Sequence, residues 1–320
     1  MSKHYLITGG AGFIGSHLAD RLLDSGHRVT VLDDLSTGTL DNIAHRIASA
    51  DFCFEQGSVL DQELVERLMA SVDVVVHLAA VVGVRLIAEA PVDTLVVNMQ
   101  GTEVVLRAAA KQACKVLVAS TSEVYGKRRD LPFAEDADPI LGPSDAPRWG
   151  YAVSKLADEH LAMAYHQQFG LPVVVTRLFN TVGPRQSADY GMVLPRLVQQ
   201  ALRGDPLTVY GTGRQSRCFC SVHDVTRALV SLLDQPQANG GVFNVGSEEE
   251  ITIMALAERI IALLGSRSVI QTMPFEQVYH QGFEDIAVRK PDTRKLRDLC
   301  GWETRHDLDG IIREVAEWFF

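Results

Sequence analysis

Paired cysteines, an excess of positive charge and long apolar runs are all missing from this sequence of 320 residues. The five cysteines are odd in number and scattered, and Cys218 and Cys220 lack the second cysteine or histidine pair that a zinc site requires. We therefore expect reduced thiols and no metal. The formal net charge of -10 argues against a general nucleic-acid-binding surface, because such surfaces are basic. An anionic ligand would have to be held by particular arginines and backbone amides.

No stretch approaches about 18 consecutive apolar residues, the length that a membrane-spanning helix needs. The opening run HYLIT meets glycine at once, unlike a secretory signal. We therefore predict a cytoplasmic protein without a membrane segment. What the sequence does have is an ordinary globular composition, with 47% hydrophobic and 22% charged residues, and neither a low-complexity linker nor a repeat of fixed period.

Short β-branched runs alternate with helical apolar spacing through the first half of the chain. This alternation predicts an α/β fold with a doubly wound parallel sheet of the Rossmann type. The runs are YLIT at 5–8, RVTVLD at 28–33, VDVVVHLA at 72–79, KVLVAS at 115–120 and PVVVTRL at 172–178. After about residue 180 this alternation ends, and helices are predicted near 252–264 and 307–319. We predict an NAD-binding domain at 1–180 and a smaller α/β substrate-binding lobe at 181–320, and we leave room for the chain to cross between them.

A glycine-rich turn joins the first predicted strand to the first helix. Gly10, Gly12 and Gly15 fit the dinucleotide fingerprint, in which glycines permit a tight turn, a close approach to pyrophosphate and packing of helix on strand. The next strand ends in Asp33 and Asp34, near the expected distance of about 20 residues from the glycines. A carboxylate there binds a ribose diol and repels a 2′-phosphate, so the pattern predicts NAD rather than NADP.

Tyr151 and Lys155 are four residues apart on one face of a predicted helix. An ammonium near a phenol stabilises the phenolate, which would lower the pKa of Tyr151 toward the range of a general base. The phenolate would then take a proton from a sugar hydroxyl while NAD takes the hydride. An exposed lysine beside a core tyrosine is the alternative. The glycine fingerprint upstream and the hydroxyl cluster at 120–122 favour catalysis.

The segments TGGAGFIG, HLAA, STSEVYG, YAVSK and RLFNTVGPR together resemble the extended short-chain dehydrogenase/reductase family that modifies nucleotide sugars, over about residues 3–318. The resemblance implies NAD recycled within each turnover, a nucleotide-sugar substrate, and a homodimer built from the 91–112 and 150–169 helices. It implies cofactor-binding positions at Gly9, Gly12, Phe13, Ile14, Gly15, Asp33, Asp34, Ser58, Val59, Leu78, Ala79, Ala80, Asn98, Tyr151 and Lys155. Ser58 departs from the family, since relatives commonly carry an aspartate facing the adenine.

The same resemblance places substrate binding in the second half of the chain, with 207–211 near the nucleoside base. The positions implied are Asn180, Arg185, Val193, Leu194, Thr208, Val209, Tyr210, Arg217 and Arg289. Fork-shaped guanidinium groups suit a diphosphate in an acidic protein. A surface salt bridge is the alternative role for each of these arginines.

Glu123 separates the reactions of the resembled family. Its members oxidise the sugar at C4; then 4-epimerases return hydride to the other face, 4,6-dehydratases remove the C5 proton and lose water, and decarboxylases lose the C6 carboxylate. Thr121-Ser122-Glu123 differs from the Thr-Ser-Ser common in 4-epimerases and from the Thr-Asp-Glu of thymidine-diphosphate-glucose dehydratases. The stretches 140–155 and 282–303 resemble UDP-glucuronate decarboxylases. This resemblance maps the catalytic positions onto Thr121, Ser122, Glu123, Tyr151, Lys155 and Arg289.

The leading hypothesis is therefore an NAD-dependent UDP-glucuronate decarboxylase that yields a UDP-pentose or its 4-keto precursor. A UDP-hexose or UDP-hexuronate 4-epimerase is the first alternative, in which Glu123 only caps its turn. An NDP-sugar 4,6-dehydratase, such as one acting on a GDP-sugar, is the second. A non-catalytic NAD-binding protein is the third, and the intact Thr121, Tyr151 and Lys155 argue against it.

Overall fold

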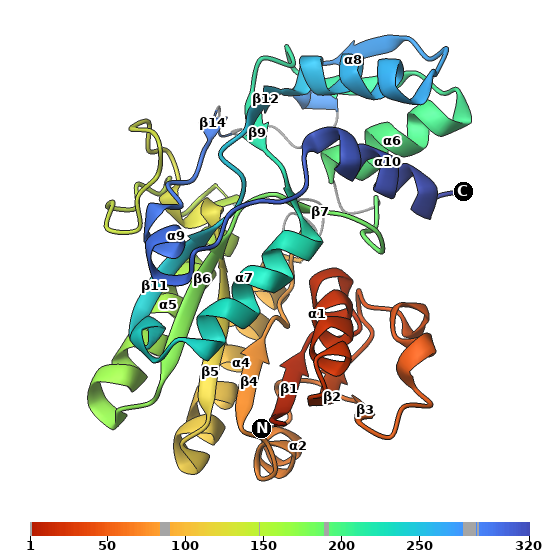
Figure 1. Ribbon diagram of the computed structural model, residues 1–320. Coiled ribbons are helices and arrows are strands. Elements are labelled where there is room, and N and C mark those ends of the chain that lie inside the picture. Colours follow the sequence, from red (N-terminus) through yellow and green to blue (C-terminus); the bar gives the residue numbers. More distant parts are fainter. Residues whose placement is uncertain (1, 84–89, 147, 189–191, 278–285, 287) are drawn as a thin grey trace.

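The computed structural model describes residues 2–83, 90–146, 148–188, 192–277, 286 and 288–320. Its centre is a sheet of seven parallel strands in the order β11-β6-β5-β4-β1-β2-β3 (Figure 1). The strands are β1 (His4–Thr8), β2 (Arg28–Asp33), β3 (Phe52–Gln56), β4 (Val74–His77), β5 (Lys115–Thr121), β6 (Val173–Leu178) and β11 (Gly241–Val245). The predicted α/β fold and its five predicted strands are confirmed, while β3 and β11 were not predicted.

Helices cover both faces of this sheet, which explains why its strands are apolar almost throughout. Tyr5 and Ile7 of β1 join the same buried cluster as Leu18 of α1. Leu6, between them, points to the other face and shares a cluster with Val105 of α4. The covering helices are α1 (Phe13–Asp24), α7 (Val222–Asp234) and α9 (Arg294–Cys300) on the first face, and α2 (Gln62–Met69), α4 (Pro91–Gln112) and α5 (Arg148–Phe169) on the second.

A second lobe lies beyond the carboxyl ends of the strands, at the top of Figure 1. Its core is a separate cluster in which three helices pack together with strand β8. The helices are α6 (Val193–Arg203), α8 (Ile253–Leu264) and α10 (Leu308–Trp318). Short strands complete the lobe: β7 (Thr181–Val182) with β10 (Cys220–Ser221), β8 (Leu207–Tyr210) with β13 (Ile270–Met273), and β9 (Ser216–Cys218) with β12 (Glu250–Thr252) and β14 (Val288–Arg289). The helices predicted near 252–264 and 307–319 are confirmed as α8 and α10.

The chain returns to the large sheet after it has entered the second lobe. β11 pairs with β6 along its whole length, from Gly241 beside Val174 to Val245 beside Leu178. Helix α7, which precedes β11, packs on α1 and on the same sheet. Residues on both sides of the predicted boundary near 180 therefore build the first lobe.

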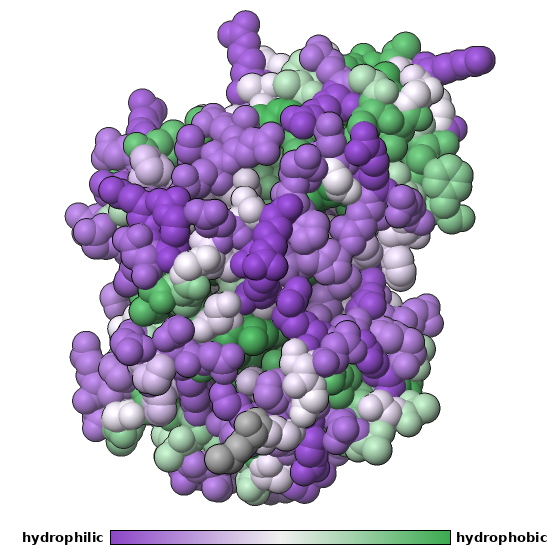
Figure 2. All heavy atoms as spheres, viewed as in Figure 1, coloured by the Kyte–Doolittle hydropathy of each residue, from purple (hydrophilic) through white to green (hydrophobic). Residues whose placement is uncertain are grey.

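The surface in the view of Figure 2 is mostly hydrophilic, with hydrophobic residues gathered near the outer end of the second lobe. All five cysteines are free thiols. Within the described part of the chain, no helix combines the length and the apolar character needed to cross a bilayer.

Candidate active site

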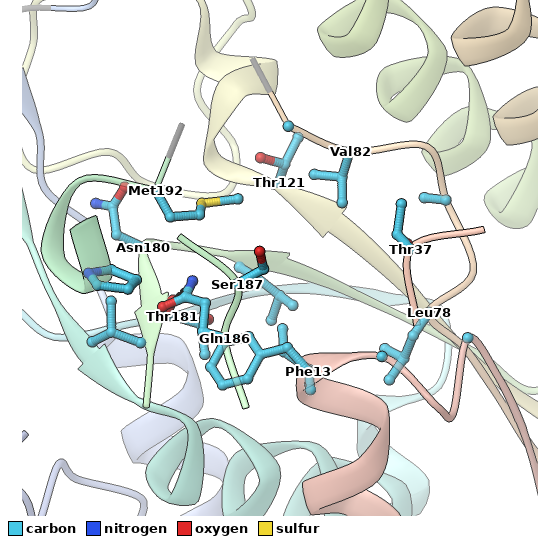
Figure 3. A pocket seen from close by; sticks show the side chains of 18 of the residues that line it. Phe13, Thr37, Leu78, Val82, Thr121, Asn180, Thr181, Gln186, Ser187 and Met192 are labelled. Atoms are coloured by element: carbon cyan, nitrogen blue, oxygen red, sulfur yellow. Dashed lines mark hydrogen bonds between the residues drawn. The ribbon is translucent and has the colours of Figure 1, made fainter. Parts of the chain in front are cut away.

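A cavity of about 1010 Å³ lies where the carboxyl ends of the strands meet the second lobe. The strand order reverses between β1 and β4, and ligands of doubly wound folds bind at such a reversal. In Figure 3, Phe13, Leu78 and Thr121 of the first lobe surround the same space as Asn180 and Met192. Most predicted site residues line this cavity, namely Gly9, Gly12, Phe13, Ile14, Gly15, Asp33, Asp34, Val59, Leu78, Ala79, Ala80, Thr121, Ser122, Glu123, Tyr151, Lys155, Asn180, Arg185, Val193, Leu194, Tyr210, Arg217 and Arg289.

Four predicted residues are not among those that line the cavity. Asn98 is buried behind the wall, where its Oδ1 accepts a hydrogen bond of 2.8 Å from the backbone N–H of Val81. The hydroxyl of Ser58 is engaged in a local turn. Thr208 directs its side chain to neighbouring groups of α6, and Val209 belongs to the core of the second lobe. Asn98 and Thr208 thus support the walls of the cavity through hydrogen bonds.

The glycine-rich turn forms a cradle that side chains would fill. A Cβ atom on Gly15 would lie 2.3 Å from the carbonyl oxygen of Gly9, and one on Gly9 would lie 2.8 Å from the backbone nitrogen of Ala79. Gly9 also has a φ of 72°, which favours glycine. Helix α1 begins immediately afterwards, with Gly12 as its N-cap. Its first amides and its dipole suit a pyrophosphate, as dinucleotide binding requires.

Asp33 is fixed at the end of β2, next to this cradle. Its carboxylate accepts hydrogen bonds from the backbone N–H groups of Ala11 at 2.9 Å and Leu35 at 2.8 Å. Burial raises the pKa of Asp33. Asp34 also lines the cavity but is exposed, and it caps the turn through Ser36. A glycine cradle followed by a held carboxylate fits the pyrophosphate and the ribose diol of NAD.

Thr121, Tyr151 and Lys155 also line the cavity. Their charges and hydrogen bonds differ from those that the sequence predicted. The Thr121 side chain acts to lower the pKa of the Tyr151 phenol. The Lys155 ammonium instead donates to Asp158 at 2.8 Å, inside the protein. Burial and the nearby charge of Glu123 raise the pKa of Tyr151 above its ordinary value. The net shift is therefore opposite to the predicted one, because burial and the charges of Glu123 and Asp158 outweigh the groups that favour the phenolate.

Glu123 faces guanidinium groups from three distant segments. Arg289 donates a hydrogen bond of 3.1 Å from Nη1 to its Oε1, and Nη2 of Arg148 lies 3.7 Å from the same oxygen. Burial opposes ionisation, yet the charges of Arg148, Arg289 and Arg217 hold the pKa of Glu123 below its ordinary value. The turn itself is capped by Thr121, whose hydroxyl accepts from the Glu123 N–H. The carboxylate is thus a largely buried anion within the cavity, only 13% exposed, and does not serve as the cap.

Sequence reasoning missed Arg148, the first residue of α5. Its position three residues before Tyr151, on the same helix face, was the available signal. Arg196 was also missed; its guanidinium lies 4.1 Å from the ring centre of Tyr210 on the cavity wall. Arg185 lines the cavity as predicted, but its Nη2 donates to Asp20 of α1 at 2.8 Å. That ion pair ties the loop after β7 to helix α1.

A family model, the NAD dependent epimerase/dehydratase family, matches residues 5–246. The chain belongs to this family. It is 42% identical to the UDP-N-acetyl-alpha-D-glucosaminuronate decarboxylase of Bacillus cytotoxicus, over 100% of this chain and 98% of that protein. It is 38% identical to UDP-glucuronic acid decarboxylase 1 of Danio rerio, over 99% of this chain and 72% of that protein.

A solved structure of the UDP-glucuronic acid 4-epimerase of Bacillus cereus, in complex with UDP-glucuronic acid and NAD, superposes with a TM-score of 0.88. It is 29% identical and covers 98% of each chain. The resemblance to extended short-chain dehydrogenases/reductases is thereby confirmed. The protein is an NAD-dependent enzyme of this family.

Proposed function

We propose that the enzyme decarboxylates a UDP-hexuronate after oxidising its sugar at C4, and that it yields a UDP-pentose or the 4-keto precursor. The observation that carries the proposal is the ionised Glu123 between Arg148 and Arg289, in the cavity that also holds Thr121 and Tyr151. The relatives named as decarboxylases match nearly the whole chain.

The first step uses the wall formed by α5 and the end of β5. Tyr151 takes the proton of the C4 hydroxyl, and the Thr121 side chain favours the phenolate form of Tyr151. NAD, when bound, accepts the hydride from C4 and contributes a cationic ring that favours the phenolate. Lys155, held by Asp158, lies in the same wall.

The second step follows from the position of the C6 carboxylate, which is β to the new C4 ketone. The C5–C6 bond breaks, carbon dioxide leaves, and the electron pair passes into an enolate over C5, C4 and its oxygen. Arg148 and Arg289 stabilise this charge as it develops. Arg289 acts by its charge and by orienting water, because a guanidinium does not give up its proton in proteins. The water that Arg289 orients then gives a proton to C5. Return of the hydride from the reduced cofactor to C4, together with return of the Tyr151 proton to the C4 oxygen, gives the UDP-pentose; without that return the 4-keto precursor is the product.

The charge around Glu123 also bears on the substrate. Among the described residues, the guanidinium groups of Arg148, Arg289 and Arg217 all lower the pKa of the Glu123 carboxyl. Such surroundings favour a sugar that carries its own carboxylate over a neutral hexose. UDP-glucuronate and UDP-N-acetylglucosaminuronate, which differ at C2, are the two candidates that the relatives' names supply.

A UDP-hexuronate 4-epimerase is the second candidate function. The similarity to the Bacillus cereus epimerase favours it, because that protein also binds an anionic sugar. An epimerase would leave the C6 carboxylate on the sugar, so Glu123 and Arg289 would then take no part in the reaction.

We also propose a homodimer through α4 and α5. These helices pack on each other and leave large hydrophobic side chains exposed, namely Val92, Val96, Met99 and Val153. A second copy would cover this apolar surface. Analytical ultracentrifugation of the wild type and of Met99→Glu would test the dimer.

The reaction is tested by incubating the purified enzyme with UDP-glucuronate, UDP-N-acetylglucosaminuronate or UDP-glucose, followed by mass spectrometry and proton NMR. The proposal expects loss of carbon dioxide from at least one hexuronate. Glu123→Gln keeps the shape of the side chain without its charge and should abolish that loss. Glu249→Gln, at an exposed position, is the matched control. Unchanged mass with inversion at C4 would establish the epimerase, and loss of water a dehydratase.

A further inference from the structure

A fully buried asparagine joins three chain segments behind the cavity. Asn244 lies on β11 and is not among the lining residues. Its Oδ1 accepts a hydrogen bond of 2.7 Å from the Tyr125 hydroxyl. Its Nδ2 donates to the carbonyl oxygens of Phe133 at 2.7 Å and Asp292 at 3.1 Å. The amide therefore uses its oxygen and both of its N–H groups.

These segments carry the two members of the ion pair in the site. Tyr125 lies two residues after Glu123, and Asp292 lies three residues after Arg289. Phe133 secures the second segment, because its N–H donates to the carbonyl of Lys290 at 2.8 Å and its carbonyl accepts from the N–H of Asp292 at 2.9 Å. Glu123 and Arg289 are 166 residues apart in sequence, so their contact depends on how these segments are fixed.

The surroundings of Asn244 hold its partners in place. The Tyr125 ring stacks on Phe133 with centres 4.7 Å apart, and the Arg177 guanidinium lies 4.8 Å from the Tyr125 ring centre. Burial raises the pKa of Tyr125 to about 12, so its hydroxyl keeps the proton that it donates. An aspartate at position 244 would offer no donors to the two carbonyls. The Phe133 carbonyl would keep the hydrogen bond from the Asp292 N–H, whereas the Asp292 carbonyl would lose the one that it accepts from Asn244.

We propose that Asn244 is a positioning residue that holds Arg289 against Glu123 for the decarboxylation step. The inference rests on the proposed function. Oxidation at C4 depends on Thr121 and Tyr151, which Asn244 does not contact. Loosening the Asn244 hydrogen bonds should therefore slow the loss of carbon dioxide more than it slows the oxidation.

The test compares two near-isosteric variants with the wild type. Asn244→Asp keeps the acceptor for Tyr125 and removes both donors; Tyr125→Phe keeps the ring and removes only the donated hydroxyl. Rapid-quench mass spectrometry with the accepted hexuronate measures oxidation and decarboxylation separately. Asn244→Asp should lower the ratio of decarboxylated to oxidised sugar by about tenfold or more, because small misplacements of reacting groups cost up to about a hundredfold. Tyr125→Phe should lower it less, and it supplies the answer if Asn244→Asp does not fold.

Val116→Ala is the matched control for stability, since Val116 is buried at the opposite end of β5. It should leave the ratio unchanged. Equal slowing of both steps in both network variants would overturn the proposal and leave Asn244 with a purely structural role. If the wild type releases no carbon dioxide from either hexuronate, the proposed function fails. Positioning is then read from the carbon-13 NMR titration of the Glu123 carboxyl: Asn244→Asp should raise its pKa by withdrawing Arg289, and an unchanged titration overturns the inference.

Discussion

Arg177 and Glu159 form a buried ion pair that supports the strand end carrying Thr121. Nη2 of Arg177 lies 2.8 Å from Oε2 of Glu159, and Nε lies 3.0 Å from Oε1. Ser120, immediately before Thr121, donates its hydroxyl to the same carboxylate at 2.5 Å. The two charged side chains are only 8% and 5% exposed. Replacing Arg177 by methionine would leave the Glu159 charge buried without its cation.

The expected cost follows from that burial. Removing one partner of a buried pair destabilises a protein by about 3–5 kcal/mol. At about 2 °C per kcal/mol, the value for large domains, the midpoint of thermal unfolding should fall by about 6–10 °C. Replacing both partners, as in Arg177→Met with Glu159→Leu, should recover most of the loss, because a well-packed apolar pair is often as stable as a buried ion pair.

Thermal and urea unfolding of the two variants would measure these changes. Arg203→Met, at an exposed position, is the control and should leave the midpoint unchanged. The reasoning is refuted if Arg177→Met lowers the unfolding free energy by less than about 1 kcal/mol, well below the cost of an unpaired buried charge. It is also refuted if the double variant is no more stable than the single one.

Three further predictions concern the cofactor and pH. Gly15→Ala places a Cβ atom 2.3 Å from the Gly9 carbonyl oxygen and should weaken NAD binding by about a hundredfold in calorimetry. Gly26→Ala, which meets no described atom within 4 Å but is strained by a φ of 77°, controls for backbone strain away from the cradle and should not change NAD binding; equal losses would contradict the cradle. The pKa of Glu123 is held below its ordinary 4.5, so its ion pairs stabilise the fold fully above about pH 4.5, and this contribution is lost as pH falls through the lowered pKa. The difference in unfolding free energy between wild type and Glu123→Gln should therefore shrink in acid, and a constant difference would speak against the ion pair. Burial lowers the pKa of His77 to about 3, so protonation of the unfolded chain below pH 6.5 should destabilise the wild type by up to about 1.4 kcal/mol per pH unit relative to His77→Gln. Parallel pH profiles for these two proteins would show that His77 is not held neutral.

The strands that the sequence predicted are those buried on both faces, since continuous apolar runs identify them. β3 was not predicted because it lies at the edge of the sheet and its apolar residues are followed by the polar Glu55 and Gln56. β11 was not predicted because it begins with a glycine and contains Asn244, so its local sequence lacks the continuous apolar run of a buried strand. Its place is set by pairing with β6, which lies more than 60 residues earlier in the chain.

In the site, too, features that depend on local sequence could be predicted, whereas features that depend on tertiary contacts could not. The glycine cradle and the Tyr151–Lys155 spacing are local patterns, so they could be read directly from the sequence. The spacing of Arg148 from Tyr151 is local, but the contacts of Arg148 and Arg289 with Glu123 join distant segments of the chain and depend on the tertiary fold. The pKa argument for Tyr151 failed for this reason, because the neighbours that matter include Glu123, from another segment of the chain.

The return of the chain to the sheet at β11 restricts how this architecture can be inherited. A recombination event near residue 180 that joined the first half of one relative to the second half of another would also exchange α7 and β11, which complete the cofactor-binding sheet. The hybrid would have to match β6 with a foreign β11, and its Asn244 equivalent with a foreign Tyr125 and Phe133. New sugar specificities should therefore arise more readily by substitution within the cavity than by exchange of whole lobes.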